Sequence, residues 1–133
     1  MYKIVATLTG IANLGFALMW LLQPRTVLSL WIVEHTDTCA IIEPRLAILL
    51  ATLSLLLLLS RNAPPSPTRS AICIAMVFGA LSLATISLYD LWSGIASAGV
   101  LPGVGFNLFF ALVFAIVEWN ARSEIREAKR ART

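Results

Sequence analysis

The sequence predicts an all-α protein, a transmembrane four-helix bundle with both termini in the cytoplasm. Of its 133 residues, 59% are hydrophobic and only 13% are charged, whereas a soluble domain carries about 25% charged residues. The hydrophobic residues gather in four long runs without Lys, Arg, Asp or Glu, and the basic residues flank these runs unevenly. A soluble chain of this length could not bury so much apolar surface in one core. We therefore expect residues 1–133 to form a single integral membrane domain.

The four runs predict four spans. A helix needs roughly 20 residues, within a range of about 17–25, to cross the hydrocarbon core of a bilayer. The second run, Leu46–Ser60, is the shortest. We expect Pro44 in the first helical turn and Arg61 at the interface to lengthen that helix. The predicted spans are 4–22, 43–61, 70–89 and 101–119.

The first span carries small residues at a spacing that favours close helix packing. Ala6 and Gly10 are four residues apart, and Gly15 follows further along, so a neighbouring helix could approach the backbone closely. The span ends before Pro24, with no small-residue cleavage site after it, which argues against a cleaved signal peptide.

The first outer loop, residues 23–42, is expected to be the longest. Its apolar segment 27–33 is too short to cross a bilayer and contains Trp31. We expect this segment to lie at the membrane interface or on the mouth of the bundle. The polar side chains after it do not have the spacing of a recognised metal site. A loop exposed to water would be expected to contain such residues. We therefore predict no metal and no cofactor at Glu34, His35, Asp37 and Cys39.

The second and third spans differ in their side chains. The second is rich in Leu and suits contact with lipid or with a partner, and a proline-rich connector, residues 61–69, ends it. The third span contains Cys73, expected as a small core residue, and the best seam of small residues in the chain. That seam consists of Ala71, Ala75, Gly79, Ala80 and Ala84.

The fourth span is expected to begin with Pro102 in its first turn and to continue as a charged cytoplasmic helix through the tail, residues 120–133. Glu118, at its inner end, is four residues before Arg122, in the order that favours an ion pair on one helix face.

The distribution of basic residues predicts the orientation. Cytoplasmic loops of membrane proteins are enriched in Lys and Arg. With four spans, both termini and the 61–69 connector share one side, and Arg25 and Arg45 are on the other. We expect the first side to face the cytoplasm of a bacterial-type inner membrane and to attract anionic lipid headgroups, so the net charge of +3 needs no nucleic-acid partner. The basic residues of that side are Lys3, Arg61, Arg69, Arg122, Arg126, Lys129, Arg130 and Arg132.

Polar residues inside the apolar runs are the candidate functional residues, because placing a polar side chain in the hydrocarbon core costs free energy and is rare without a role. Asn13 and Asn107 lie within the first and fourth spans. We favour hydrogen bonds from their amides across helices, and the alternative is a polar cavity that both residues line.

Three charged residues are candidates at the outer ends of the spans. Arg45 opens the second span and Asp90 closes the third, and spans joined by a short connector are usually neighbours. An ion pair between them would lower the cost of two charges near hydrocarbon. The alternatives are that each extends into the headgroups, or that Arg45 pairs with Glu43.

Several segments resemble small DoxX-like membrane proteins. They are Thr9–Gly15, Trp20–Pro24, the apolar stretch that ends at Trp31, and Arg45–Ile48. The resemblance implies four spans, a first helix with Gly and Asn that is closed by Pro, and an Arg at the start of the second helix. Some relatives are small subunits of quinone-linked membrane oxidoreductases, so quinone is the one cofactor that the resemblance implies.

The residues favour a non-enzymatic role. The sequence contains no nucleophile elbow, phosphate-binding loop or zinc-protease motif. Our first hypothesis is an accessory or homo-oligomeric subunit of a membrane complex. The second is a small carrier or channel with a polar path near Asn13, Asn107, Arg45 and Asp90. The third, from the resemblance, is a small subunit of a quinone-linked oxidoreductase.

Overall fold

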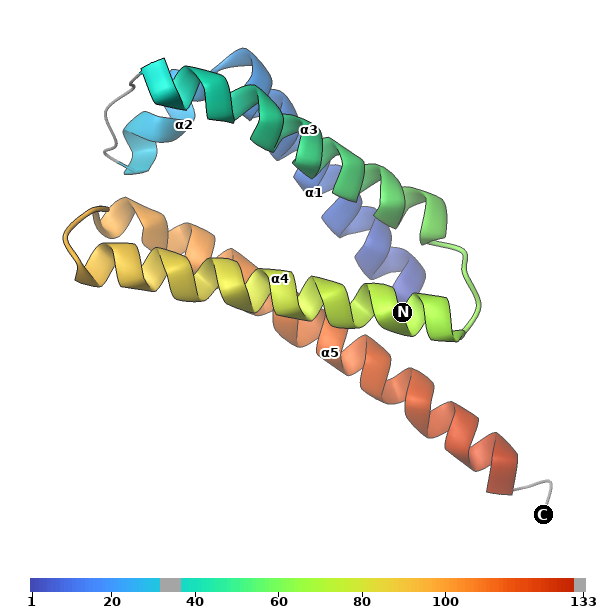
Figure 1. Ribbon diagram of the computed structural model, residues 1–133. Coiled ribbons are helices and arrows are strands. Elements are labelled where there is room, and N and C mark those ends of the chain that lie inside the picture. Colours follow the sequence, from blue (N-terminus) through green and yellow to red (C-terminus); the bar gives the residue numbers. More distant parts are fainter. Residues whose placement is uncertain (32–36, 131–133) are drawn as a thin grey trace.

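The computed structural model describes residues 1–31 and 37–130, with side chains described at 1–29 and 43–123. Within these residues all regular secondary structure is helical (Figure 1). Four helices are long and apolar enough to cross a membrane, in agreement with the four predicted runs. The elements are α1 (Tyr2–Leu22), α2 (Pro24–Trp31), α3 (Asp37–Ser60), α4 (Pro67–Trp92), η1 (Ala98–Val100) and α5 (Leu101–Arg130).

The long helices associate as two pairs. In Figure 1, α1 runs alongside α3, and α4 runs alongside α5. The pairs meet near the N-terminus, where a core cluster draws side chains from all four helices. The expectation that consecutive spans are neighbours fails for α3 and α4, because each packs mainly on a different partner. The cluster contains Tyr2, Val5, Ala6, Leu57, Cys73, Met76, Phe114 and Val117.

The backbones of α1 and α3 come close at Gly10. A Cβ atom on Gly10 would lie 2.9 Å from Cγ of Leu58 and 3.3 Å from the carbonyl oxygen of Ser54. The Ser54 hydroxyl donates a hydrogen bond of 2.6 Å to the carbonyl oxygen of Gly10. Ala6, one turn earlier, is completely buried. The predicted close approach at Ala6 and Gly10 is therefore confirmed, whereas Gly15 is exposed and touches no neighbouring helix.

Helix α2 covers the other end of the α1–α3 pair. Val27 and Leu28 are buried against Trp20 of α1 and Ala47 of α3, and α2 also contacts the turn η1. The apolar segment expected at the interface or the bundle mouth thus packs, over its described part, on the end of the bundle. Its remaining residues lie outside the described part.

Helix α3 begins earlier than predicted. We expected Pro44 in the first turn, but the helix starts at Asp37 and continues through Pro44. Proline removes one backbone hydrogen bond from a helix interior, a loss that membrane helices tolerate where other groups satisfy the backbone.

The ends of α4 and α5 follow local sequence signals. The hydroxyl of Ser66 caps α4 by accepting a 3.2 Å hydrogen bond from the backbone N–H of Arg69, with Pro67 in the first turn. The chain leaves α4 through Gly94, whose positive φ of 74° suits glycine. Pro102 lies in the first turn of α5, as predicted, and the helix extends beyond the other helices to Arg130 (Figure 1).

The outer surface of the four spans is apolar. No more than 33% of the residues in any spanning window are buried, so most apolar side chains face outward. Leu49, Leu56 and Leu59 of α3 and Phe78 of α4 are examples. Monomeric soluble proteins rarely expose contiguous apolar patches larger than a few hundred Å², and this distribution therefore fits a protein that lies in lipid.

We predict that Gly10→Leu will destabilise the α1–α3 pair by about 1–3 kcal/mol, because overpacking a close contact forces side chains and backbone apart. The free energy of unfolding can be measured in mild detergent by titration with a denaturing detergent. Gly15→Leu adds the same side chain to the same helix at a position with open space and serves as the control. Equal effects of the two substitutions would contradict the proposed contact.

Candidate functional site

Polar side chains concentrate at the end of the bundle where α1 and α4 begin and α3 ends, which we call the basic end. Tyr2 is buried there, and its hydroxyl lies 2.9 Å from the hydroxyl of Ser60, at hydrogen-bond distance. The guanidinium of Arg69 lies over the Tyr2 ring, 4.7 Å from its centroid, in cation–π geometry. One Nη of Arg69 also donates a 3.5 Å hydrogen bond to the carbonyl oxygen of Ala63. These contacts connect α1, α3 and the start of α4.

Glu118 links α4 to α5 at the same end. The Ser70 hydroxyl of α4 donates a hydrogen bond to Oε1 of Glu118, and Nε of Arg122 donates to the same oxygen at 2.5 Å. The predicted Glu118–Arg122 ion pair is thus confirmed. The Glu118 side chain is only 12% exposed, so hydrogen-bond partners are needed to offset the loss of hydration.

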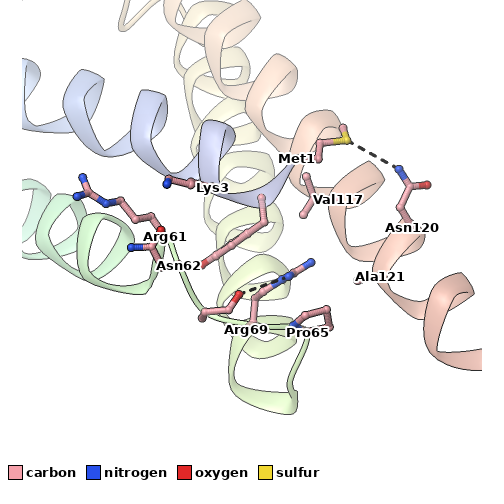
Figure 2. A pocket seen from close by; sticks show the side chains of 11 residues that line it. Met1, Lys3, Arg61, Asn62, Pro65, Arg69, Val117, Asn120 and Ala121 are labelled. Carbon is pink, nitrogen blue, oxygen red and sulfur yellow. Dashed lines mark hydrogen bonds between the residues drawn. The ribbon is translucent and has the colours of Figure 1, made fainter. Parts of the chain in front are cut away.

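A pocket of about 350 Å³ opens beside these contacts, and we call it the basic pocket. Figure 2 shows Lys3 and Arg61 on one side, Arg69 with Pro65 on another, and Asn120 on a third. The amide of Asn120 lies 3.8 Å from the sulfur of Met1, within hydrogen-bond distance for sulfur. Three cationic side chains therefore line one cavity, and the described lining residues include no carboxylate.

Asn13 and Asn107, the predicted intramembrane candidates, are both half-buried. Asn13 follows the buried Thr9 by one turn, and Asn107 lies between the buried Val104 and Ala111, so both amides are on or beside the inner faces of their helices. Neither amide forms a hydrogen bond within the described part of the chain. The Thr9 hydroxyl is also buried without a partner there.

The candidates at the outer ends are not brought together as an ion pair. Arg45 is exposed and Asp90 half-buried, and Arg45 pairs with neither Asp90 nor Glu43 among the described side chains. The reason is the pairing of helices, which places α3 on α1 and α4 on α5. Asp90 contributes its backbone carbonyl, which accepts hydrogen bonds from Ile95 and Ala96 at 2.9 and 3.1 Å. Glu43 is buried, on the inner face of α3.

The cysteine and metal predictions have different outcomes. Cys73 is fully buried in the core cluster, as expected. Within the described residues no group of three or more His, Cys, Asp or Glu could hold a metal ion. The side chains of Glu34, His35, Asp37 and Cys39 lie outside the described residues, so the prediction for that loop stays a prediction.

Sequence reasoning missed Tyr2, Arg69 and Ser70 as site residues. Lys3, Arg61 and Arg69 served only to predict orientation, although their joint position at the span ends was visible in the sequence. Their convergence on one pocket depends on how the two helix pairs meet. Ser70, the partner of Glu118 across helices, lies just before an apolar run and carries no sequence signal of its own.

Comparisons with protein-family models, with curated proteins and with solved structures give no match. The resemblance to DoxX-like proteins therefore stays a prediction.

We predict that Ser70→Ala and Glu118→Ala will each destabilise the protein by about 1–2 kcal/mol, since each removes the hydrogen bond between the Ser70 hydroxyl and the largely buried Glu118 carboxylate. The double variant should lose less than the sum, because both changes remove the same contact. Unfolding in mixed detergent micelles measures the three values. Ser123→Ala removes a hydroxyl bonded only to its own helix and should change stability little. Additive losses would exclude the Ser70–Glu118 contact.

Proposed function

We propose that the protein is a non-catalytic subunit that associates laterally in the membrane, with copies of itself or within a larger complex. The observation that carries the proposal is the outward face of α4. Ala71 and Ala75 are exposed, and a Cβ atom on Gly79 would meet nothing within 4 Å. These three residues are spaced four apart and therefore share one side of the helix.

The opposite part of the predicted seam is already occupied. Ala80 and Ala84 are buried, on the side of α4 that carries Cys73 and Met76 and packs against α5. The small residues of the third span thus divide into one group used within the chain and one group left outside it. Lipid tails are as apolar as Leu, so helices associate through close van der Waals contact at small residues. A stripe of Ala71, Ala75 and Gly79 offers that contact to a partner helix.

The same proposal places the basic end in the cytoplasm of a bacterial-type inner membrane. Lys3, Arg61, Arg69 and Arg122 all lie at this end, and the enrichment of Lys and Arg in cytoplasmic segments supports the orientation.

A second candidate, the small carrier or channel, has one specific observation in its favour. The hydroxyl of Thr9 and the amides of Asn13 and Asn107 lie within or beside the apolar interior without hydrogen-bond partners in the described part of the chain. Proteoliposomes that carry no ion or solute flux would exclude this candidate. The quinone-linked subunit stays a prediction. We expect quinone to meet such a subunit near the outer interface, where Trp92 is 86% exposed at the end of α4, and a lack of quinone binding would exclude that role.

Lateral association predicts a complex that depends on the α4 face. Native mass spectrometry from mild detergent should show oligomers or a retained partner, and Ala75→Leu with Gly79→Leu should shift the protein toward the monomer by roughly ten-fold or more, since loss of close packing removes on the order of 1–2 kcal/mol. Gly15→Leu is the control, because a Cβ atom on Gly15 of α1 also meets nothing within 4 Å. Wild-type protein that is strictly monomeric and without a partner would refute the proposal.

The orientation predicts the behaviour of a reporter fused after Thr133. A reporter that is active only in the cytoplasm should be active there, because four spans return the C-terminus to the side that carries most basic residues. A reporter that works only outside the cytoplasm, fused at the same place, should be silent. A silent cytoplasmic reporter together with an active external reporter would show that the orientation is the opposite of the proposed one.

A further inference from the structure

The basic pocket is lined by positively charged side chains and by no described carboxylate that could neutralise them. Lys3, Arg61 and Arg69 line it, and the described lining residues include no Asp or Glu. Among the described side chains at this end, the carboxylate of Glu118 is engaged by Ser70 and Arg122 and does not line the pocket. Like charges that share a cavity repel one another and attract an anion.

One of the cations is held in position. Arg69 lies between the Tyr2 ring, 4.7 Å from its guanidinium carbon, and the carbonyl oxygen of Ala63. Tyr2 is itself fixed by its contact with Ser60. A guanidinium has five N–H donors in a rigid fork that suits phosphate oxygens, and the Ala63 contact uses one of them. The remaining donors of a positioned arginine are suited to an oxyanion.

The pocket lies at the ends of the candidate spans, where the headgroups of a bilayer would be. The candidate spans Tyr2–Leu22 and Pro67–Trp92 begin at this end, and Glu43–Ser60 ends here. Val117 and Ala121 supply an apolar wall beside the cations. At about 350 Å³ the cavity is within the size range of small-ligand pockets. A basic pocket between membrane helices at this depth fits the headgroup of an anionic lipid.

We propose that the basic pocket binds a phosphate group, carried by the headgroup of an anionic phospholipid, with Lys3, Arg61 and Arg69 contacting its oxygens. The site is independent of lateral association through α4. It differs from the general attraction between a basic membrane surface and anionic lipid because three side chains from α1, the α3–α4 loop and α4 line one cavity.

Lipid binding by the whole protein tests this site. Native mass spectrometry of the detergent-solubilised protein, titrated with phosphatidylglycerol, phosphatidylcholine or inorganic phosphate, measures each affinity separately. We expect the wild type to bind phosphatidylglycerol in preference to phosphatidylcholine. Lys3→Gln with Arg61→Gln should weaken phosphatidylglycerol binding about 25-fold, at about five-fold for each cation near the membrane surface, and leaves the Arg69 contacts in place. Arg69→Gln should weaken it further.

The control is Arg122→Gln, which removes one positive charge at the same end from a residue outside the pocket. It should change phosphatidylglycerol binding by less than about two-fold, because its charge is already paired with Glu118. A loss as large as that of the pocket variants would show diffuse surface attraction and overturn the site. Equal affinity for the two lipids would also overturn it. Inorganic phosphate that binds with the same dependence on Lys3 and Arg61, without lipid preference, would retain the phosphate site and reject the lipid as its source.

Discussion

The close contact between α1 and α3 at Gly10 sets the geometry of the first helix pair. At this position the backbone of α1 lies against Leu58 and Ser54 with no room for a Cβ atom, and the Ser54 hydroxyl hydrogen-bonds across the contact. Helices in lipid gain little from hiding apolar surface from one another, so van der Waals contact and hydrogen bonds must hold them together. The Gly10 contact supplies both kinds of interaction. It also brings the start of α1 to the end of α3, where Tyr2 meets Ser60.

Further contacts connect this helix pair to α4 and α5. Tyr2 and its neighbours join the core cluster that reaches α4 and α5, and Arg69 stacks on the Tyr2 ring. On the second pair, Ser70 and Arg122 satisfy Glu118. The two pairs are therefore joined at the basic end by apolar packing and by the contact of Arg69 with Tyr2. The proposed lipid site lies within this junction, where a bound headgroup would strengthen the connection between the pairs.

The sequence predicts the elements well and their partners less well. Runs without charge, proline at helix starts and the Ala6–Gly10 spacing are local signals, and the structure has the four helices and the Gly10 contact that they predict. The predicted Arg45–Asp90 pair is not formed because it required α3 and α4 to be neighbours. Four helices can pack in several arrangements, and no local sequence signal selects one of them. Pro44 lies inside a helix for a similar reason: proline marks a preferred helix start, but in a membrane the surroundings decide whether the helix continues. The basic pocket could not be predicted for the same reason, since its residues come from three segments and only the arrangement of the helices brings them together.

Removal of detergent and lipid tests most directly whether the apolar surface of this protein must be covered by acyl chains. Sedimentation velocity can compare the purified protein in mild detergent, in lipid nanodiscs and in plain buffer. With its spans at most one-third buried, the protein should sediment as one defined species in detergent and in nanodiscs, and should aggregate once both are absent. A monodisperse, helical protein in plain buffer would contradict the account.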